Sequence, residues 1–100
     1  MKVVITHKAS FGREQVVRYL YRQFGEKAVL EFRQSYKTIK QQLVRFPESG
    51  AIEWNLSDED TTYRSVVIAR LSKMVYYVEE DTIYIVDFWD TRKEPPTEIE

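Results

Sequence analysis

Hydrophobic and polar residues alternate with two different periods along this chain of 100 residues. Between residues 7 and 46 the apolar side chains recur every three or four positions, which is the period of an amphipathic helix. From residue 63 onward they gather into short runs rich in valine, isoleucine and aromatic residues, which are typical of β-strands. The pattern therefore predicts helices in the first half of the chain and a sheet in the second.

Two helices should follow a short first strand, which the apolar run over residues 2–6 predicts. The helices are expected over residues 7–24 and 26–46, with Gly25 at the turn between them and Pro47 and Gly50 closing the second. A turn this short makes the two helices an antiparallel hairpin. Their apolar stripes need a surface to cover, and we expect packing on the sheet through Leu20, Phe24, Phe32, Ile39 and Leu43.

Three strands are predicted in the second half, over residues 66–71, 74–78 and 83–89. The acidic run at 79–81 is so short that the last two strands should be adjacent and antiparallel. Between residues 51 and 62, Ile52, Trp54 and Leu56 alternate with polar residues, which permits a short edge strand before a loop. The elements follow the order β-α-α-β-β-β, and the optional edge strand would come before the last three strands. This order predicts an α+β fold: a helical hairpin packed on a small, twisted, mostly antiparallel sheet.

Length and composition fit one domain with a modest core, since 43% of the residues are hydrophobic and 31% are charged. The chain has no cysteine, which excludes disulfides and thiolate metal sites. No apolar run reaches the length of a signal peptide or a membrane span. We expect a domain over residues 1–95, a frayed acidic tail over 96–100, a cytoplasmic location without membrane contact, and neither cofactor nor metal.

Charge is divided unevenly between the two halves, although the net charge is only −1. Residues 1–46 contain ten lysines and arginines and three acidic residues, a balance of +7, whereas residues 47–100 contain five and thirteen, a balance of −8. This asymmetry indicates a basic face that can meet an anionic partner. Alternatively, the two halves attract each other and merely solvate their outer faces.

Cations with interleaved aromatic residues bracket the expected sheet. Arginine binds phosphate or carboxylate through paired hydrogen bonds, and aromatic rings stack on bases, so such a surface suits an anionic or nucleic-acid target. Alternatively, the arginines pair with Asp87, Asp90 and the acidic run at 79–81, and the aromatic residues belong to the core. The single histidine, His7, is interpreted as a surface or capping residue. The candidate target-binding residues are Arg64, Arg70, Lys73, Trp89, Arg92 and Lys93.

Four short segments occur in a fixed order in the second half of the chain. They are FPESG at 46–50, the Tyr63-Arg64 pair before a strand, an aromatic-rich hairpin at 75–85, and DTRKEP at 90–95 after the last strand. In this order and spacing they resemble the RelE/ParE family of bacterial toxins from toxin–antitoxin pairs, and the likeness covers roughly residues 3–95. The resemblance implies the fold expected above and a hetero-oligomer in which a cognate antitoxin keeps the toxin silent.

The resemblance also implies where chemistry would lie. In RelE-like ribonucleases, cations on the sheet position the phosphate, and Arg64 and Arg92 match those positions. The histidine often found two residues before the last arginine is Asp90 here, and no tyrosine follows Arg92. Asp90 is a poor general acid, and its carboxylate would repel phosphate. This departure favours the ParE-like branch, which lacks such an acid–base set and acts by inhibiting DNA gyrase.

Three functions remain open at this stage. The favoured hypothesis is a ParE-like gyrase inhibitor that is no enzyme and binds its antitoxin through the basic helical half, at Arg13, Arg18, Arg22 and Arg33. The second is a RelE-like endonuclease that cleaves ribosome-bound mRNA. Its catalytic candidates are Arg64 and Arg92, which would bind the phosphate, and Asp90 or a tyrosine, which would act as the general base. The third is a toxin-like fold retained only as a binding module.

Overall fold

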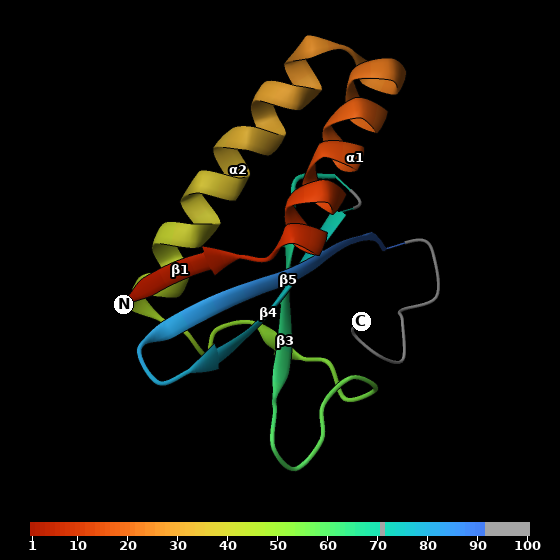
Figure 1. The fold of residues 1–100 in the computed structure, drawn as a ribbon. Helices are drawn as coiled ribbons and strands as arrows, with labels where there is room; N and C mark the ends of the chain where they lie inside the picture. Colours follow the sequence, from red (N-terminus) through yellow and green to blue (C-terminus); the bar gives the residue numbers. More distant parts are fainter. Residues whose placement is uncertain (71, 92–100) are drawn as a thin grey trace.

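The computed structural model describes residues 1–70 and 72–91 and confirms the α+β fold class (Figure 1). Arg92 and Lys93 therefore lie outside the described residues, as does the tail expected over 96–100. The elements in chain order are β1 (Lys2–Ile5), α1 (His7–Phe24), α2 (Glu26–Arg45), β2 (Ala51–Ile52), β3 (Tyr63–Ile68), β4 (Ser72–Glu79) and β5 (Thr82–Asp90).

The strands form one sheet in the order β1-β5-β4-β3-β2. Strand β1 pairs with β5 in parallel, and every other pair is antiparallel, as the sequence predicts for most of the sheet. The optional edge strand exists as the two-residue β2. Val75 pairs with Asp87 but the next residue, Tyr76, pairs with Ile85, so Val86 is the extra residue of a β-bulge in β5.

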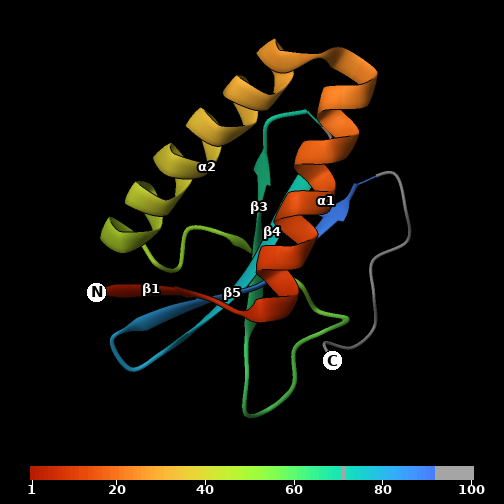
Figure 2. The same ribbon diagram turned by 45° about the horizontal axis from the view of Figure 1, so that its top comes forward.

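The start of α1 and the turn between the two helices have clear local causes. The Thr6 hydroxyl accepts a hydrogen bond from the amide of Ala9 at 3.1 Å and so caps the start of α1. Gly25 separates the helices with a φ of 87°, a conformation that glycine adopts at little cost. The hairpin covers one side of the sheet, with α1 against β5 and α2 against β3 and β1 (Figure 2).

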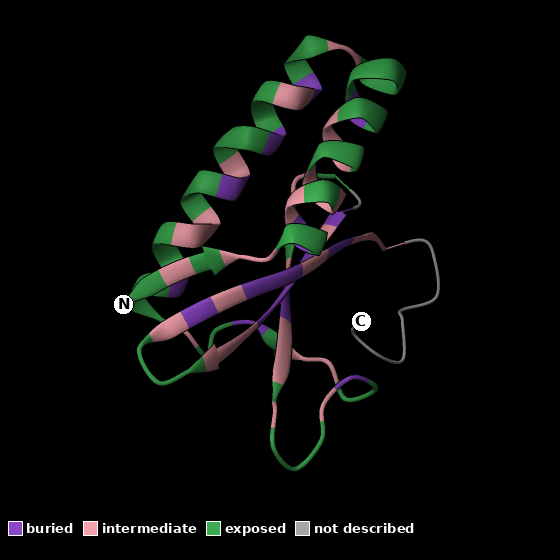
Figure 3. Ribbon diagram, in the orientation of Figure 1, coloured by how far each residue is buried: buried purple, intermediate pink, exposed green. Residues whose placement is uncertain are grey.

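The main core fills the space between the hairpin and the sheet (Figure 3). Phe32 of α2 is completely buried, and its ring lies 6.3 Å from that of Phe88 on β5. Leu20 and Leu43 are buried as predicted, and Ile39 packs against the core from its edge. Phe24 is the exception, because 52% of its surface is exposed. It lies on the last turn of α1, where the Arg70 guanidinium covers its ring at 4.4 Å.

The first strand of the second half is shifted from its predicted position. It begins at Tyr63 rather than Val66 and ends at Ile68, because the chain turns at Arg70 with a φ of 64°. Arg70 therefore lies at the bend between β3 and β4, where the sequence places it. Within the described residues, neither helix is apolar enough to cross a membrane.

Candidate functional site

The face of the sheet that points away from the helices carries a second, smaller apolar cluster. Val75 and Val86 are buried there, and Leu56 from the loop between β2 and β3 packs over them. Four large rings surround this cluster on the outer face of the sheet, hereafter the outer face: Tyr63, Tyr77, Tyr84 and Trp89. The outer face is thus partly covered by the chain itself, and its aromatic residues are half-buried.

Three tyrosines form a row across neighbouring strands of the outer face. Tyr63 pairs with Tyr77, and Tyr77 pairs with Tyr84, in the register of the sheet. The first two rings meet edge to face at 5.5 Å, and the second pair stacks at 5.0 Å. Burial, followed by the charge of Glu79, raises the pKa of Tyr77, so its hydroxyl is protonated at neutral pH. We call Tyr63, Tyr77 and Tyr84 the tyrosine row.

Lys73 and Trp89, both predicted to bind a target, are paired neighbours on the outer face. The Lys73 ammonium lies 5.9 Å from the centre of the Trp89 ring. It also donates a hydrogen bond of 3.1 Å to the Glu53 carboxylate, which accepts a second one from the hydroxyl of buried Ser65. The charge of Lys73 is therefore neutralised within the chain by a residue from the loop after β2.

Arg64 holds the FPESG loop against the sheet. Its guanidinium donates hydrogen bonds of 2.9 Å to the carbonyl oxygens of Glu48 and Gly50. Beside it, the buried Tyr76 hydroxyl donates to the Pro47 carbonyl at 2.8 Å and accepts from the Gly50 amide at 3.0 Å. A side chain at position 50 would begin only 2.6 Å from that hydroxyl, which explains the glycine. Arg64 is thus bound to the backbone of its own chain.

Arg70 joins the sheet to the helical hairpin. Its guanidinium lies 3.6 Å from the Glu31 carboxylate on α2 and 4.4 Å from the centre of the Phe24 ring on α1. Arg64 lies near the start of β3 and Arg70 beyond its end, so the sheet does not gather these two candidate residues into one site.

Asp90, the candidate general base, is the last residue of β5 and pairs with Ser72. Arg64 pairs with Tyr76, four residues further along β4. At roughly 3.3 Å per residue, Arg64 and Asp90 are therefore about 13 Å apart along the strand direction alone. The described part of the chain does not bring these two catalytic candidates together, and Arg92 falls outside it.

The four candidate antitoxin-binding arginines differ in their surroundings. Arg18, Arg22 and Arg33 are exposed on the outer surfaces of α1 and α2, and none of them makes an ion pair with another described residue. Arg13 is partly buried, and its guanidinium donates a hydrogen bond of 3.2 Å to the Tyr36 hydroxyl between the helices. Three of the four are thus available to a partner, while Arg13 also joins the helices.

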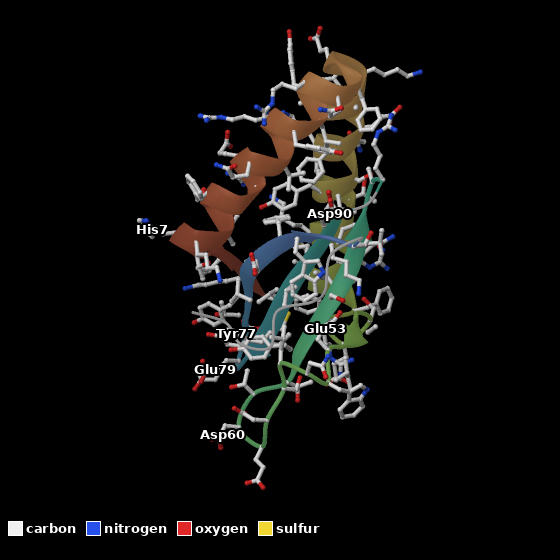
Figure 4. All side chains as sticks on the ribbon, turned by 90° about the vertical axis from the view of Figure 1, so that its right-hand side faces the viewer. His7, Glu53, Asp60, Tyr77, Glu79 and Asp90 are labelled. Atoms are coloured by element: carbon white, nitrogen blue, oxygen red, sulfur yellow. The ribbon has the colours of Figure 1, made fainter. Side chains whose placement is uncertain are left out.

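Among the described residues, the remaining titratable groups form no cluster that could hold a metal ion. Within residues 1–70 and 72–91, no three histidine, aspartate or glutamate side chains lie close enough to hold an ion. His7 is exposed at the start of α1, as expected, far from Asp90 in Figure 4. Burial raises the pKa of Asp87, while the Lys8 ammonium at 3.8 Å and a hydrogen bond from the Phe88 amide partly offset this effect.

Sequence reasoning missed two features of the outer face, the tyrosine row and Glu53. The tyrosine row could have been predicted from the strand pairing: once Tyr63 is paired with Tyr77 and Tyr77 with Tyr84, the three side chains lie on the same face of the sheet. Glu53 gave no such signal, since it lies in a loop 20 residues from the lysine that it neutralises.

The architecture is that of a helical hairpin covering one side of a mostly antiparallel sheet, a fold shared with a known solved structure. A chain of the structure described as "Chromosomal ParDE TA system from P. aeruginosa" superimposes with a TM-score of 0.67 and 16% sequence identity. The match covers 90% of this chain and 95% of that chain. No family model and no curated protein sequence matches this chain. At this identity the likeness establishes a ParE-like fold.

Proposed function

We propose that this chain is the toxin of a type II toxin–antitoxin pair and inhibits DNA gyrase by direct protein contact in the cytoplasm. One observation carries the proposal: the fold matches a chain from a ParDE toxin–antitoxin system over nearly the whole length of both. The sequence motifs at 46–50, 63–64 and 90–95 resemble the same family independently of that match.

The state of the sheet cations favours binding over RNA cleavage. Cleavage by a neighbouring 2′-hydroxyl needs a proton acceptor, a proton donor and stabilisation of the charged phosphate in one place. Arg64 is bonded to carbonyl oxygens, Lys73 is paired with Glu53, and Asp90 lies about 13 Å along the sheet from Arg64. A ribonuclease would require the sheet to give up these contacts.

The outer surface of the helical hairpin fits an acidic, amphipathic antitoxin segment. Residues 7–45 contain nine lysines and arginines against three glutamates, a balance of +6. Apolar side chains stand among these cations: Leu30 is 59% exposed and Tyr21 is 58% exposed. A partner segment with acidic and apolar residues would pair with the cations and cover the apolar groups, which would form the hetero-oligomer.

Growth and gyrase assays together test this proposal. Expression of the chain alone should arrest bacterial growth, and co-expression of the small reading frame adjacent to its gene should restore it. The purified chain should block supercoiling by gyrase and leave ribosome-bound mRNA intact. Growth arrest with cleaved message and normal supercoiling would instead establish the RelE-like alternative. If expression of the chain alone does not slow growth, the remaining hypothesis is a toxin-like fold that serves only as a binding module.

A further inference from the structure

A cavity of about 380 Å³ opens at the end of the sheet where β3 and β4 part. Tyr63, the first residue of β3, pairs with Tyr77, so the last two residues of β4 continue past the start of β3. The pairing of β3 with β4 begins at Tyr63, and the residues just before it belong to no strand. Figure 4 shows Tyr77, Glu79 and Asp60 at this end of the sheet, and all three line the cavity.

Three carboxylates surround the cavity, and the described chain neutralises none of them. Glu48, Asp60 and Glu79 are exposed and make no ion pair within residues 1–70 and 72–91. The one cation in the lining is Arg64, one of whose guanidinium nitrogens already donates to two backbone carbonyl oxygens. The cavity therefore carries a net negative charge that a bound cation would offset.

Two rings of the tyrosine row, Tyr63 and Tyr77, form one wall of the cavity. Contact with each other and stacking on Tyr84 fix their orientation, so the ring surface is present before any ligand arrives. The loop that contributes Asp60 and Thr61 to the lining is also held in place, because the Asp58 carboxylate accepts hydrogen bonds of 2.9 and 2.8 Å from the amides of these two residues. An aromatic surface beside carboxylates attracts cations by two independent interactions.

We propose that this cavity binds an arginine side chain of a protein partner. Guanidinium is planar, so it can lie against one of the two rings, Tyr63 or Tyr77, while it donates paired hydrogen bonds to Asp60 or Glu79, which the rounder ammonium of lysine does less well. The negative charge of the cavity repels nucleic acid and an acidic antitoxin segment, so neither suits this site. The inference holds whether or not the chain is a toxin, and it places this contact apart from the basic hairpin.

The probe is N-acetyl-arginine amide, titrated into the purified full chain and followed by backbone amide NMR shifts. Shifts should concentrate at the residues that line the cavity, at millimolar concentrations because a single side chain makes the contact. N-acetyl-citrulline amide is the matched control, since it has the same shape without the charge. Equal shifts with citrulline, or no shifts at the cavity with arginine, would overturn the proposal.

A pair of double variants separates the cavity from the general acidity of this region. Asp60→Asn with Glu79→Gln removes two lining carboxylates, whereas Glu59→Gln with Glu80→Gln makes the same charge change on neighbouring exposed residues that do not line the cavity. The first double variant should bind the arginine probe roughly tenfold more weakly, and the second should bind like the parent. Melting temperatures check that both remain folded. Equal weakening in both variants would show attraction by overall charge and reject the site.

Discussion

Three arginines of the helical hairpin and two cations of the sheet have opposite surroundings. On the hairpin, Arg18, Arg22 and Arg33 project into solvent without an ionic partner among the described residues. On the sheet, Arg64 binds two carbonyl oxygens and Lys73 binds Glu53. The sheet cations therefore stabilise the fold, whereas these hairpin arginines remain available to a partner.

This difference shows why residue type alone does not identify a binding site. A cation that already has close partners must lose them before it can meet a ligand, and a group left unsatisfied in that exchange costs about 1–3 kcal/mol. An exposed arginine loses only water. An anionic partner should therefore prefer the hairpin to the sheet, even though the sheet carries the residues that resemble a phosphate site.

The largest effect should come from the inner face of the hairpin, whose apolar residues fill the main core. Phe32→Ala is expected to lower the free energy of unfolding by about 3–5 kcal/mol, because it empties a fully buried site. Leu30→Ala, on the same helix but 59% exposed, should change it by less than about 0.5 kcal/mol. Urea unfolding measures both. Similar losses in the two variants would mean that the hairpin does not pack as described.

Arginine variants test the contrast directly. Arg64→Ala should lower the free energy of unfolding by about 1–3 kcal/mol, because two loop carbonyls lose their donor. Arg18→Ala should change it by no more than about 0.5 kcal/mol. Urea unfolding of both proteins provides the comparison. If Arg64→Ala is as stable as the parent yet no longer arrests growth, the sheet carries the functional cations and the contrast is broken.

Exchange of the free hairpin arginines should slow capture by the antitoxin. With Arg18, Arg22 and Arg33 all replaced by glutamine, the association rate at low salt should fall roughly tenfold, because long-range attraction is lost. Stopped-flow or surface-based kinetics measure the rate. The parent rate should also decline steeply as salt is added, whereas the variant rate should stay nearly level. A parent rate that ignores salt would point to apolar recognition instead.

A smaller effect is expected at Arg70, which lies in the turn between β3 and β4 and contacts the hairpin. Arg70→Ala should cost about 0.5–1 kcal/mol, since it removes an exposed ion pair and a cation–π contact. Arg70→Gly loses the same contacts but adopts the positive φ of this turn freely, so it should be the more stable of the two. Thermal unfolding ranks them. The reverse order would contradict the left-handed geometry at position 70.

Asp87 should give a dependence on pH whose sign follows from burial. Its pKa is raised above 3.8, so the folded state holds the proton more tightly than the unfolded state does. The free energy of unfolding therefore falls as pH rises from the unfolded-state pKa of this carboxyl through its higher folded-state pKa. An asparagine side chain at this position is uncharged and can still accept the hydrogen bond from the Phe88 amide. Asp87→Asn should therefore exceed the parent in stability at about pH 7 and lose this advantage at about pH 3. Glu80→Gln, at an exposed site, is the control for both conditions.

The sequence predicted the helices closely because their apolar stripes and Gly25 are local signals. The predicted strand bounds were less accurate. Strand β3 begins at Tyr63 because Tyr63 pairs with Tyr77, and pairing with a residue distant in sequence cannot be recognised from the residues of the strand alone. Phe24 continues the apolar stripe but lies at the end of the helix, beyond the sheet that it would have to cover. Periodicity identifies which residues share a face and says nothing about where the opposing surface ends.

The candidate site was the least predictable part for a related reason. Composition located the sheet cations, but their availability depends on Glu53, on the carbonyls of the FPESG loop and on Glu31, all distant in sequence. The exposure of Arg18, Arg22 and Arg33 was easier to predict, since residues opposite an apolar stripe face solvent, whereas Arg13 bonds Tyr36 between the helices.

The parallel pairing of β1 with β5 governs when the protein can take its shape during synthesis. Strand β1 has one neighbour in the sheet, and 76 residues separate Ile5 from Thr82 at the start of that neighbour. At about 5–20 residues per second, the first strand waits roughly 4–15 s for the last to be made. The inner surface of α1 waits as well, because it rests on β5. A ribosome that stops before Thr82 therefore releases a chain with its apolar surfaces uncovered, a substrate for proteases.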